Sequence, residues 1–296
     1  MYCWWMTRMT AKEGARPTLI DFFLSPLAYG FMQRALIASM LVGGITALVG
    51  VYVVLKGLAF MGDAISHAAF PGVVIAFMLK TSIYFGAVLA AVGTAIGIAW
   101  VGQHKQVRLD TAIGVLFAGT FAFGVLLMST IKGYVGDLFS FLFGNVLAVS
   151  NTDLIVLGVL GGAIVLTLVA VYKELLFATF DPLGAQAAGL PVAALEYGLL
   201  ALIALTIAIS IQVVGIILVV AMLVTPAATA QQLTARFNRL LILATALSVV
   251  ESVAGLYISY YGNWASGATI VLVQTAGFGL VLLFGQRGGV LRRRAG

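Results

Sequence analysis

Two side chains with metal-binding chemistry lie four residues apart in an otherwise apolar stretch, Gly57–Gly72. They are Asp63 and His67. If the chain is helical from Ala64 onward, both project from one helix face. A carboxylate oxygen and an imidazole nitrogen suit a divalent transition-metal ion, and an incomplete ligand set lets an ion leave as readily as it enters. The alternative is structural, with Asp63 as a helix N-cap and His67 as a packing histidine.

The elements that position this pair are transmembrane helices. Of the 296 residues, 62% are hydrophobic and 9% are charged, whereas charged residues make up about 25% of a soluble domain. At about 20 residues per crossing, the chain holds about eight or nine transmembrane helices and leaves no room for a separate soluble domain. The single cysteine, Cys3, excludes an intrachain disulfide framework and a cysteine metal cage. The basic residues are better explained by membrane orientation than by a nucleic-acid partner.

Hydropathy and helix-breaking residues predict the order of the segments. Residues 1–30 form an N-terminal arm with an interfacial segment, 31–286 a transmembrane domain, and 287–296 a basic cytosolic tail. A short interfacial helix is expected between Lys132 and Asp153, and His104 is interpreted as a solvated loop histidine. The predicted spans are 35–55, 64–79 with a kink at Pro71-Gly72, 85–101, 111–131, 154–171, 195–233 divided near Gln212–Gly215, 240–260 and 266–284.

The distribution of lysine and arginine orients these spans. One side collects Lys56, Lys105, Arg108, Lys173, Arg236, Arg239, Arg287 and Arg292–Arg294, whereas the other holds Lys80 and Lys132. The positive-inside rule places the first group in the cytosol. The basic N-terminal residues then fall outside, against the same rule.

Glu251 is a further carboxylate inside a predicted span, 240–260. Ionised side chains at membrane depth are expensive and usually functional. We therefore expect Glu251 to face a dimer interface or a water-filled path, or to be neutral, and we include it as a weaker metal candidate. The alternative is a helix-packing hydrogen bond made by the protonated acid.

The cytosolic segment Lys173–Pro191 predicts a short docking helix. Asp181 can cap it, Pro182 is tolerated in its first turn, and Gly189 ends it before Pro191. Its apolar face is formed by Leu183, Ala187, Ala188 and Leu190, and small residues such as Ala185, Ala187 and Ala188 would allow close approach to a partner. Gly184 is included among the candidate coupling residues. An ordinary amphipathic linker is the alternative. The chain has no Gly-x-x-x-x-Gly-Lys-Ser/Thr phosphate loop, so ATP would have to be hydrolysed by another subunit.

Several motifs in order along the chain resemble one family, the permease subunits of ABC-type zinc and manganese importers (the ABC-3 family). The resemblance covers about Phe31 to Phe284. Its motifs are Met32-Gln33-Arg34-Ala35, Val53-Val54-Leu55-Lys56-Gly57-Leu58-Ala59-Phe60, Gly62-Asp63-Ala64-Ile65-Ser66-His67 with Pro71-Gly72, Asp181-Pro182 with Ala188-Gly189-Leu190-Pro191, Val224-Thr225-Pro226-Ala227-Ala228-Thr229-Ala230, and Ser266-Gly267-Ala268-Thr269.

This resemblance implies a multi-pass protein of the bacterial cytoplasmic membrane with a fold similar to the vitamin B12 importer permeases (type II). It implies a homodimer that is driven by two copies of an ABC ATPase subunit and fed by an extracytoplasmic metal-binding protein. ATP would bind to the partner, and no cofactor would be held permanently. Asp63 and His67 match the family motif directly, and the helix from Asp181 to Gly189 matches the family's ATPase-coupling element.

The function expected is therefore transport of Zn²⁺ or Mn²⁺, with Fe²⁺ as a third cargo, by a subunit that is not itself an enzyme. An ion-coupled secondary metal transporter is the alternative, although it would need further intramembrane carboxylates and no docking helix. An intramembrane metalloprotease would need a fuller ligand set, such as His-Glu-x-x-His.

Overall fold

The computed structural model describes residues 24–102, 108–131, 144 and 146–285, and these ranges contain helices and no strand. Eight helical segments are long and apolar enough to cross a membrane, which confirms the all-helical polytopic fold. The elements are α3 (Gly30–Leu55), α4 (Ala59–Ala68), α5 (Phe70–Met78), α6 (Ile83–Gly102), α7 (Leu109–Ser129), η1 (Val146–Ala148), α9 (Asn151–Ala170), α10 (Tyr172–Phe180), α11 (Pro182–Ala187), α12 (Val192–Leu233), α13 (Phe237–Gly262) and α14 (Ser266–Phe284).

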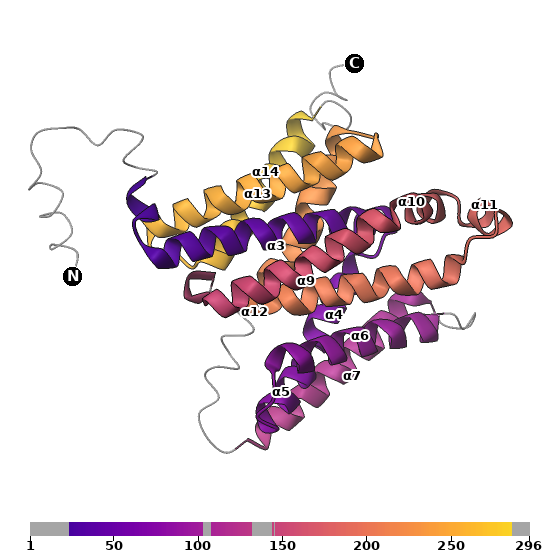
Figure 1. Ribbon diagram of the computed structural model, residues 1–296, viewed down its shortest axis with the longest axis horizontal. Helices are drawn as coiled ribbons and strands as arrows, with labels where there is room; N and C mark the ends of the chain where they lie inside the picture. Colours follow the sequence, from indigo (N-terminus) through magenta and orange to yellow (C-terminus); the bar gives the residue numbers. More distant parts are fainter. Residues whose placement is uncertain (1–23, 103–107, 132–143, 145, 286–296) are drawn as a thin grey trace, which may run out of the picture.

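The centre of the molecule is built by α3 and α12, which hold many of the fully buried side chains. The two backbones touch, because a Cβ atom at Gly50 would overlap the carbonyl oxygen of Leu223. Around this pair lie α9, α13 and α14 (Figure 1). Since lipid tails are as apolar as the side chains, close packing of small residues is what holds such helices together.

The 42-residue helix α12 doubles back at Gly215. A straight helix of that length would measure about 63 Å, twice the thickness of the hydrocarbon core. Gly215 has φ 80° and ψ 168°, a conformation that interrupts the helix and is open essentially to glycine alone. Glu196, near the start of α12, pairs with Lys56 at the end of α3, and Ala230, near the end of α12, lies in one cluster with Val51 of α3. The predicted division near Gln212–Gly215 is therefore confirmed.

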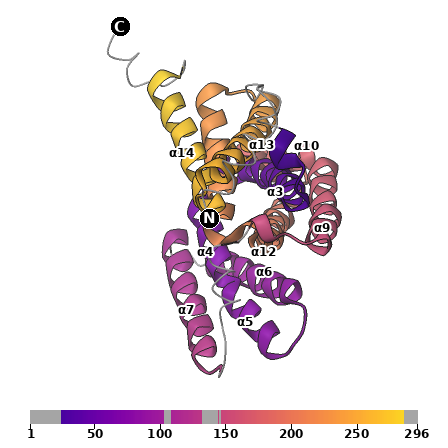
Figure 2. The same cartoon turned by 90° about the vertical axis from the view of Figure 1, so that its left-hand side faces the viewer.

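A second group of helices consists of α5, α6 and α7, and it meets the central helix α12 through α6 and the neighbouring α4 (Figure 2). The contact of α5 with α6 is again backbone to backbone, since a Cβ at Gly72 would overlap the carbonyl of Gly86, and a Cβ at Gly86 that of Gly72. The break between α4 and α5 falls at Ala69, and Pro71 occupies the first turn of α5. The chain thus changes direction where Pro71-Gly72 predicted a kink.

The start of α4 differs from the prediction. Gly57, with φ +69°, ends the turn after α3, and α4 begins at once with Ala59 instead of Ala64. Asp63 is consequently the fifth residue of α4, and the N-cap position is held by Leu58. The interpretation of Asp63 as an N-cap is wrong, because the four residues before it, 59–62, are already helical.

The two ends of the bundle differ in their numbers of lysine and arginine residues. Lys56 pairs with Glu196 at the start of α12, and Phe237 packs against Tyr172 and Phe180 of α10. Lys56, Arg236 and Arg239 therefore lie at the end of the bundle that carries α10 and its Lys173. The opposite end carries Arg34 and Lys80, and there Tyr84 donates a 2.6 Å hydrogen bond to Asp153, which also caps α9 together with Ser150. Several predicted features lie outside the described residues: the arm before residue 24, His104 and the tail from residue 286. Most of the segment in which a short helix was expected, Lys132 to Asp153, is also outside them, and its described part contains the single turn η1.

Candidate metal pathway and docking helix

Asp63 and His67 share one face of α4, as their spacing predicts. Nε2 of His67 lies 3.7 Å from Oδ1 of Asp63, which is too long for a hydrogen bond. Two ligands at about 2.1 Å from a common ion are themselves about 3 to 3.5 Å apart. A shift of a few tenths of an ångström would therefore let both atoms bind one ion.

Two aromatic rings of α7 fix the imidazole of His67. The ring centroids of Phe117 and Phe121 each lie 5.3 Å from that of His67, at interplanar angles of 70° and 87°. Nδ1 of His67 is buried and has no hydrogen-bond partner, whereas in many metal sites the second ring nitrogen donates to an acceptor. Packing thus orients this ring, and it turns Nε2 toward Asp63.

The side chain of Asp63 is 51% exposed and that of His67 is 27% exposed, although both belong to the membrane-spanning segment Ala59–Met78. An ionised carboxylate in contact with lipid within a membrane span is expensive. We therefore expect the face of α4 that carries the pair to meet water or another protein chain.

At this place the chain offers two side chains that could bind an ion, Asp63 and His67. Among the described residues there is no group of three or more His, Cys, Asp or Glu side chains. Glu251 lies on α13, which packs against α3, α12 and α14, so the structure does not bring it to Asp63 and His67. Its side chain is 7% exposed and faces α14, where a Cβ at Gly277 would overlap its Oε1 atom.

The capped helix predicted at Asp181 is present as α11. Oδ1 of Asp181 accepts the backbone N–H of Gly184 at 2.8 Å, and Pro182 occupies the first position. Gly189, with φ +85°, ends the helix, and Leu190 N–H returns to the carbonyl of Ala185 at 3.0 Å. These local bonds hold α11 at the tip of the molecule, beyond α10 (Figure 1).

Two details of α11 differ from the expected docking surface. Ala185 is fully buried within the chain, whereas Leu183 is 78% exposed, so Leu183 with Ala187 and Ala188 forms the outer surface. A Cβ at Gly184 would overlap the Asp181 carboxylate. Gly184 therefore preserves the cap instead of offering a contact surface.

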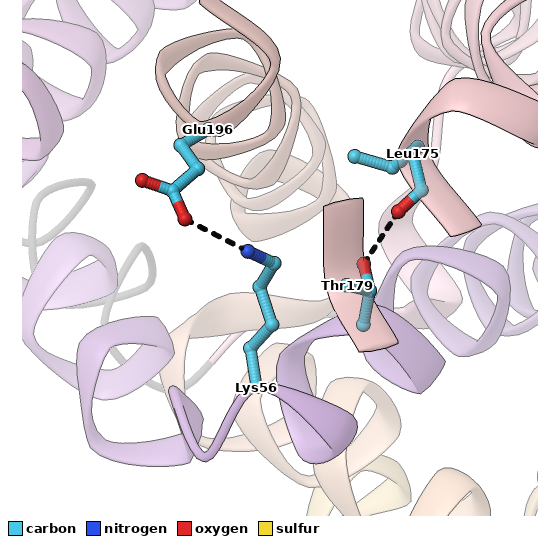
Figure 3. A network of polar contacts seen from close by, with 4 residues as sticks. All are labelled: Lys56, Leu175, Thr179 and Glu196. Atoms are coloured by element: carbon cyan, nitrogen blue, oxygen red, sulfur yellow. Dashed lines mark hydrogen bonds and ion pairs between the residues drawn. The ribbon is translucent and has the colours of Figure 1, made fainter. Parts of the chain in front are cut away.

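A charged pair that the sequence did not suggest joins α3 to α12 beside α10. Nζ of Lys56 lies 3.2 Å from Oε1 of Glu196, and Thr179 of α10 donates to the carbonyl of Leu175 nearby (Figure 3). The pair borders a cavity of about 310 Å³ whose other walls are mainly apolar, formed by residues such as Leu58, Met61, Ile98 and Leu199. No spacing rule links positions 56 and 196, so the sequence carried no local signal for it.

The fold is that of a polytopic membrane protein with eight candidate membrane-spanning segments among the described residues. The model of the ABC 3 transport family matches residues 28–285, and the chain belongs to that family. It is the permease subunit of an ABC importer in the bacterial cytoplasmic membrane, and the ATPase is a separate subunit.

Individual relatives agree with this assignment. The chain is 47% identical over 275 residues to the manganese transport system membrane protein MntC of Halalkalibacterium halodurans, covering 93% of this chain and 94% of the relative. It is 40% identical to the chelated iron transport system membrane protein YfeD of Yersinia pestis, with 90% and 89% covered. Among solved structures, PsaBC from Streptococcus pneumoniae in complex with Fab matches with a TM-score of 0.84 and 36% identity, covering 94% of this chain and all of that chain.

Proposed function

We propose that this chain forms the membrane path of an ATP-driven importer of divalent transition-metal ions, with Mn²⁺ and Fe²⁺ as the first cargoes to test and Zn²⁺ as the third. The observation that carries the proposal is the half-exposed Asp63 carboxylate beside His67 within a membrane span. The named cargoes of two relatives, manganese and iron, support the choice of ions. The ion is cargo, and no permanently bound cofactor is part of the proposal.

We further propose that the path lies between two copies of the chain. Asp63 and His67 supply two ligands, and we expect their surface not to face lipid. A second copy across a two-fold axis would present the same pair, so that two carboxylates and two imidazoles would surround the ion. Four ligands of this kind suit Mn²⁺, Fe²⁺ and Zn²⁺. The dimer would thus complete the site and cover the exposed carboxylate in one step.

The remaining partners follow from the two ends of the bundle. We propose that α11 docks into an ATPase subunit, one for each permease copy, because its Leu183, Ala187 and Ala188 surface is apolar, exposed and held rigidly by the Asp181 cap. The opposite end, which carries η1 and Lys80, would receive the ion from an extracytoplasmic metal-binding protein.

The path is tested by replacing both ligands. Asp63→Ala combined with His67→Ala is expected to abolish ⁵⁴Mn²⁺ uptake by cells that lack their own importer and express this chain with its ATPase and binding protein. Asp110→Asn changes an exposed carboxylate at the start of α7 and serves as the matched control. Normal uptake by the double variant, at equal membrane abundance, would return both residues to packing roles.

The dimer is tested with a single introduced cysteine. Phe60 is 79% exposed and lies three residues before Asp63 on the same face of α4. In a Cys3→Ser background, Phe60→Cys is expected to form a disulfide-linked dimer on mild oxidation. Phe180 is 63% exposed on α10, and the control variant Phe180→Cys should not form such a dimer. The proposed dimer fails if the two variants crosslink equally.

Docking by α11 is tested at Ala188. Ala188→Arg places a bulky charge on the outer surface without touching the Asp181 cap, so ATP hydrolysis should no longer drive uptake while membrane insertion stays normal. Gly184→Arg is expected to unfold α11 as well, since even a Cβ overlaps Asp181. Crosslinking from Leu183→Cys should capture the ATPase. Capture from the loop before α7 instead would refute this docking site.

A further inference from the structure

Several polar atoms buried between α13, α14 and α3 have no hydrogen-bond partner. Glu251 is 7% exposed, and Gln274 and Ser248 are fully buried. The unpartnered atoms are Oε2 of Glu251, both amide atoms of Gln274 and Oγ of Ser248. Buried polar atoms in native proteins are almost always satisfied by protein, water or an ion. Four such atoms on neighbouring helices therefore make this region a candidate site for a bound species.

Glu251 and Gln274 lie on the faces of α13 and α14 that pack against each other. A Cβ at Gly255 would meet Ile270 at 2.6 Å, and a Cβ at Gly277 would overlap Glu251 Oε1. Gln274 is four residues after Ile270 and three before Gly277, so the three residues share the face of α14 that contacts α13. Gln274 thus lies between two points at which α14 packs closely on α13, on the helix face that also meets the Glu251 side chain.

The helix α3 closes the seam on a third side. Ser248 precedes Glu251 by one turn of α13, and a Cβ at Gly43 of α3 would lie 3.0 Å from its Oγ atom and 3.3 Å from Oγ of Ser252. Ser252 donates its hydroxyl to the backbone carbonyl of Ser248 at 2.6 Å, whereas the Ser248 hydroxyl has no hydrogen-bond partner. We call Ser248, Glu251, Gln274 and Gly277 the α13–α14 seam.

We propose that the α13–α14 seam binds one monovalent alkali cation, with Na⁺ as the first candidate. Its ligands are the Glu251 carboxylate, the Gln274 carbonyl oxygen and the Ser248 hydroxyl, which are all hard oxygen atoms. The seam holds a single carboxylate, and a single positive charge neutralises it. Helices that touch through glycine leave a small site, which favours Na⁺ over the larger K⁺.

This site is independent of the metal path. Glu251 is buried, whereas Asp63 is half exposed, and the seam offers no imidazole or thiolate. A cation in the seam would join α13 to α14 and would remain in place while the transported ion passes. The proposal therefore does not depend on the transport function, and either can fail without the other.

The test uses the full-length chain in complex with its ATPase, in lipid nanodiscs. We expect saturable ²²Na⁺ binding with one site per permease chain. The thermal unfolding temperature should rise by about 3 °C when Na⁺ replaces N-methyl-D-glucamine at constant ionic strength. Glu251→Gln and Gln274→Leu should each weaken Na⁺ binding at least tenfold, while Asp110→Asn should bind Na⁺ as the wild type does.

If Glu251→Gln does not fold, Ser248→Ala removes one ligand with little change in volume and should weaken Na⁺ binding measurably. The proposal is overturned if no ²²Na⁺ binds, which would leave water as the species in the seam. It is also overturned if Glu251→Gln and Gln274→Leu retain full binding. Displacement of ²²Na⁺ by stoichiometric Mn²⁺ would make the seam a divalent-metal site and refute the assignment to a monovalent ion.

Discussion

Two carboxylates lie within membrane spans and have opposite surroundings. The side chain of Asp63 on α4 is half exposed and has an imidazole nitrogen 3.7 Å away, whereas Glu251 on α13 is buried and packs against Gly277 of α14. A transported ion needs a site that opens, and a resident ion needs one that stays closed. We therefore expect the exposure of an intramembrane carboxylate, and not its presence alone, to separate the two proposed roles.

Replacing each carboxylate by lysine should give the largest difference in folding between the two positions. Asp63→Lys should fold, because the position is half exposed, but its ammonium would occupy the ion's place and reduce uptake on the order of 100-fold. Glu251→Lys would bury an unpaired charge at a cost of about 3–5 kcal/mol and prevent folding. Size-exclusion chromatography and uptake measure the two effects. Equal misfolding of both variants would show that Asp63 and Glu251 do not differ in burial as described.

Adding one methyl group to the seam tests how tightly it is packed. Gly277→Ala forces the Glu251 side chain to move and should destabilise the protein by about 1–3 kcal/mol. Gly279→Ala on the same helix meets nothing within 4 Å and should be neutral or slightly stabilising. Thermal unfolding of both variants compares them directly. Equal unfolding temperatures would mean that α13 and α14 separate easily at Glu251.

Removing an aromatic ring beside His67 tests whether packing orients the imidazole for ion binding. Phe121→Ala should let the imidazole rotate and raise the apparent KM for Mn²⁺ about fivefold, with a smaller effect on the maximal rate. Phe123 is 50% exposed on the same helix, so Phe123→Ala is the control. Uptake kinetics distinguish them, and an unchanged KM in Phe121→Ala would show that the ring orientation has no part in binding.

A third carboxylate, Glu196, should give the smallest effect. Its pair with Lys56 is partly solvated, with Glu196 51% exposed. A double-mutant cycle with Lys56→Met and Glu196→Gln should yield a coupling energy of about 0.2–1 kcal/mol that decreases in high salt. A coupling energy above this range would show that the Lys56–Glu196 pair is shielded from solvent, as Glu251 is, and not solvated.

Local chemistry explains which features the sequence predicted. The spacing of Asp63 and His67, the Asp181 cap, the Gly189 terminus and the break near Gly215 each depend on residues within a few positions. Contacts between distant helices carry no such signal. The spans are apolar all round, so hydropathy does not reveal which face is buried, and for this reason the Gln274 side of the seam, the Lys56–Glu196 pair and the burial of Ala185 were not foreseen.

The reversal at Gly215 has a consequence for how the protein is made. No charged residue occurs between Glu196 and Arg236, so the insertion machinery receives two hydrophobic segments without a hydrophilic loop to export. We expect the two halves of α12 to enter the bilayer together as a hairpin, with both ends retained on the side of synthesis. A topology reporter fused at Gly215 would interrupt this step, so it would report a failed insertion and not the native orientation.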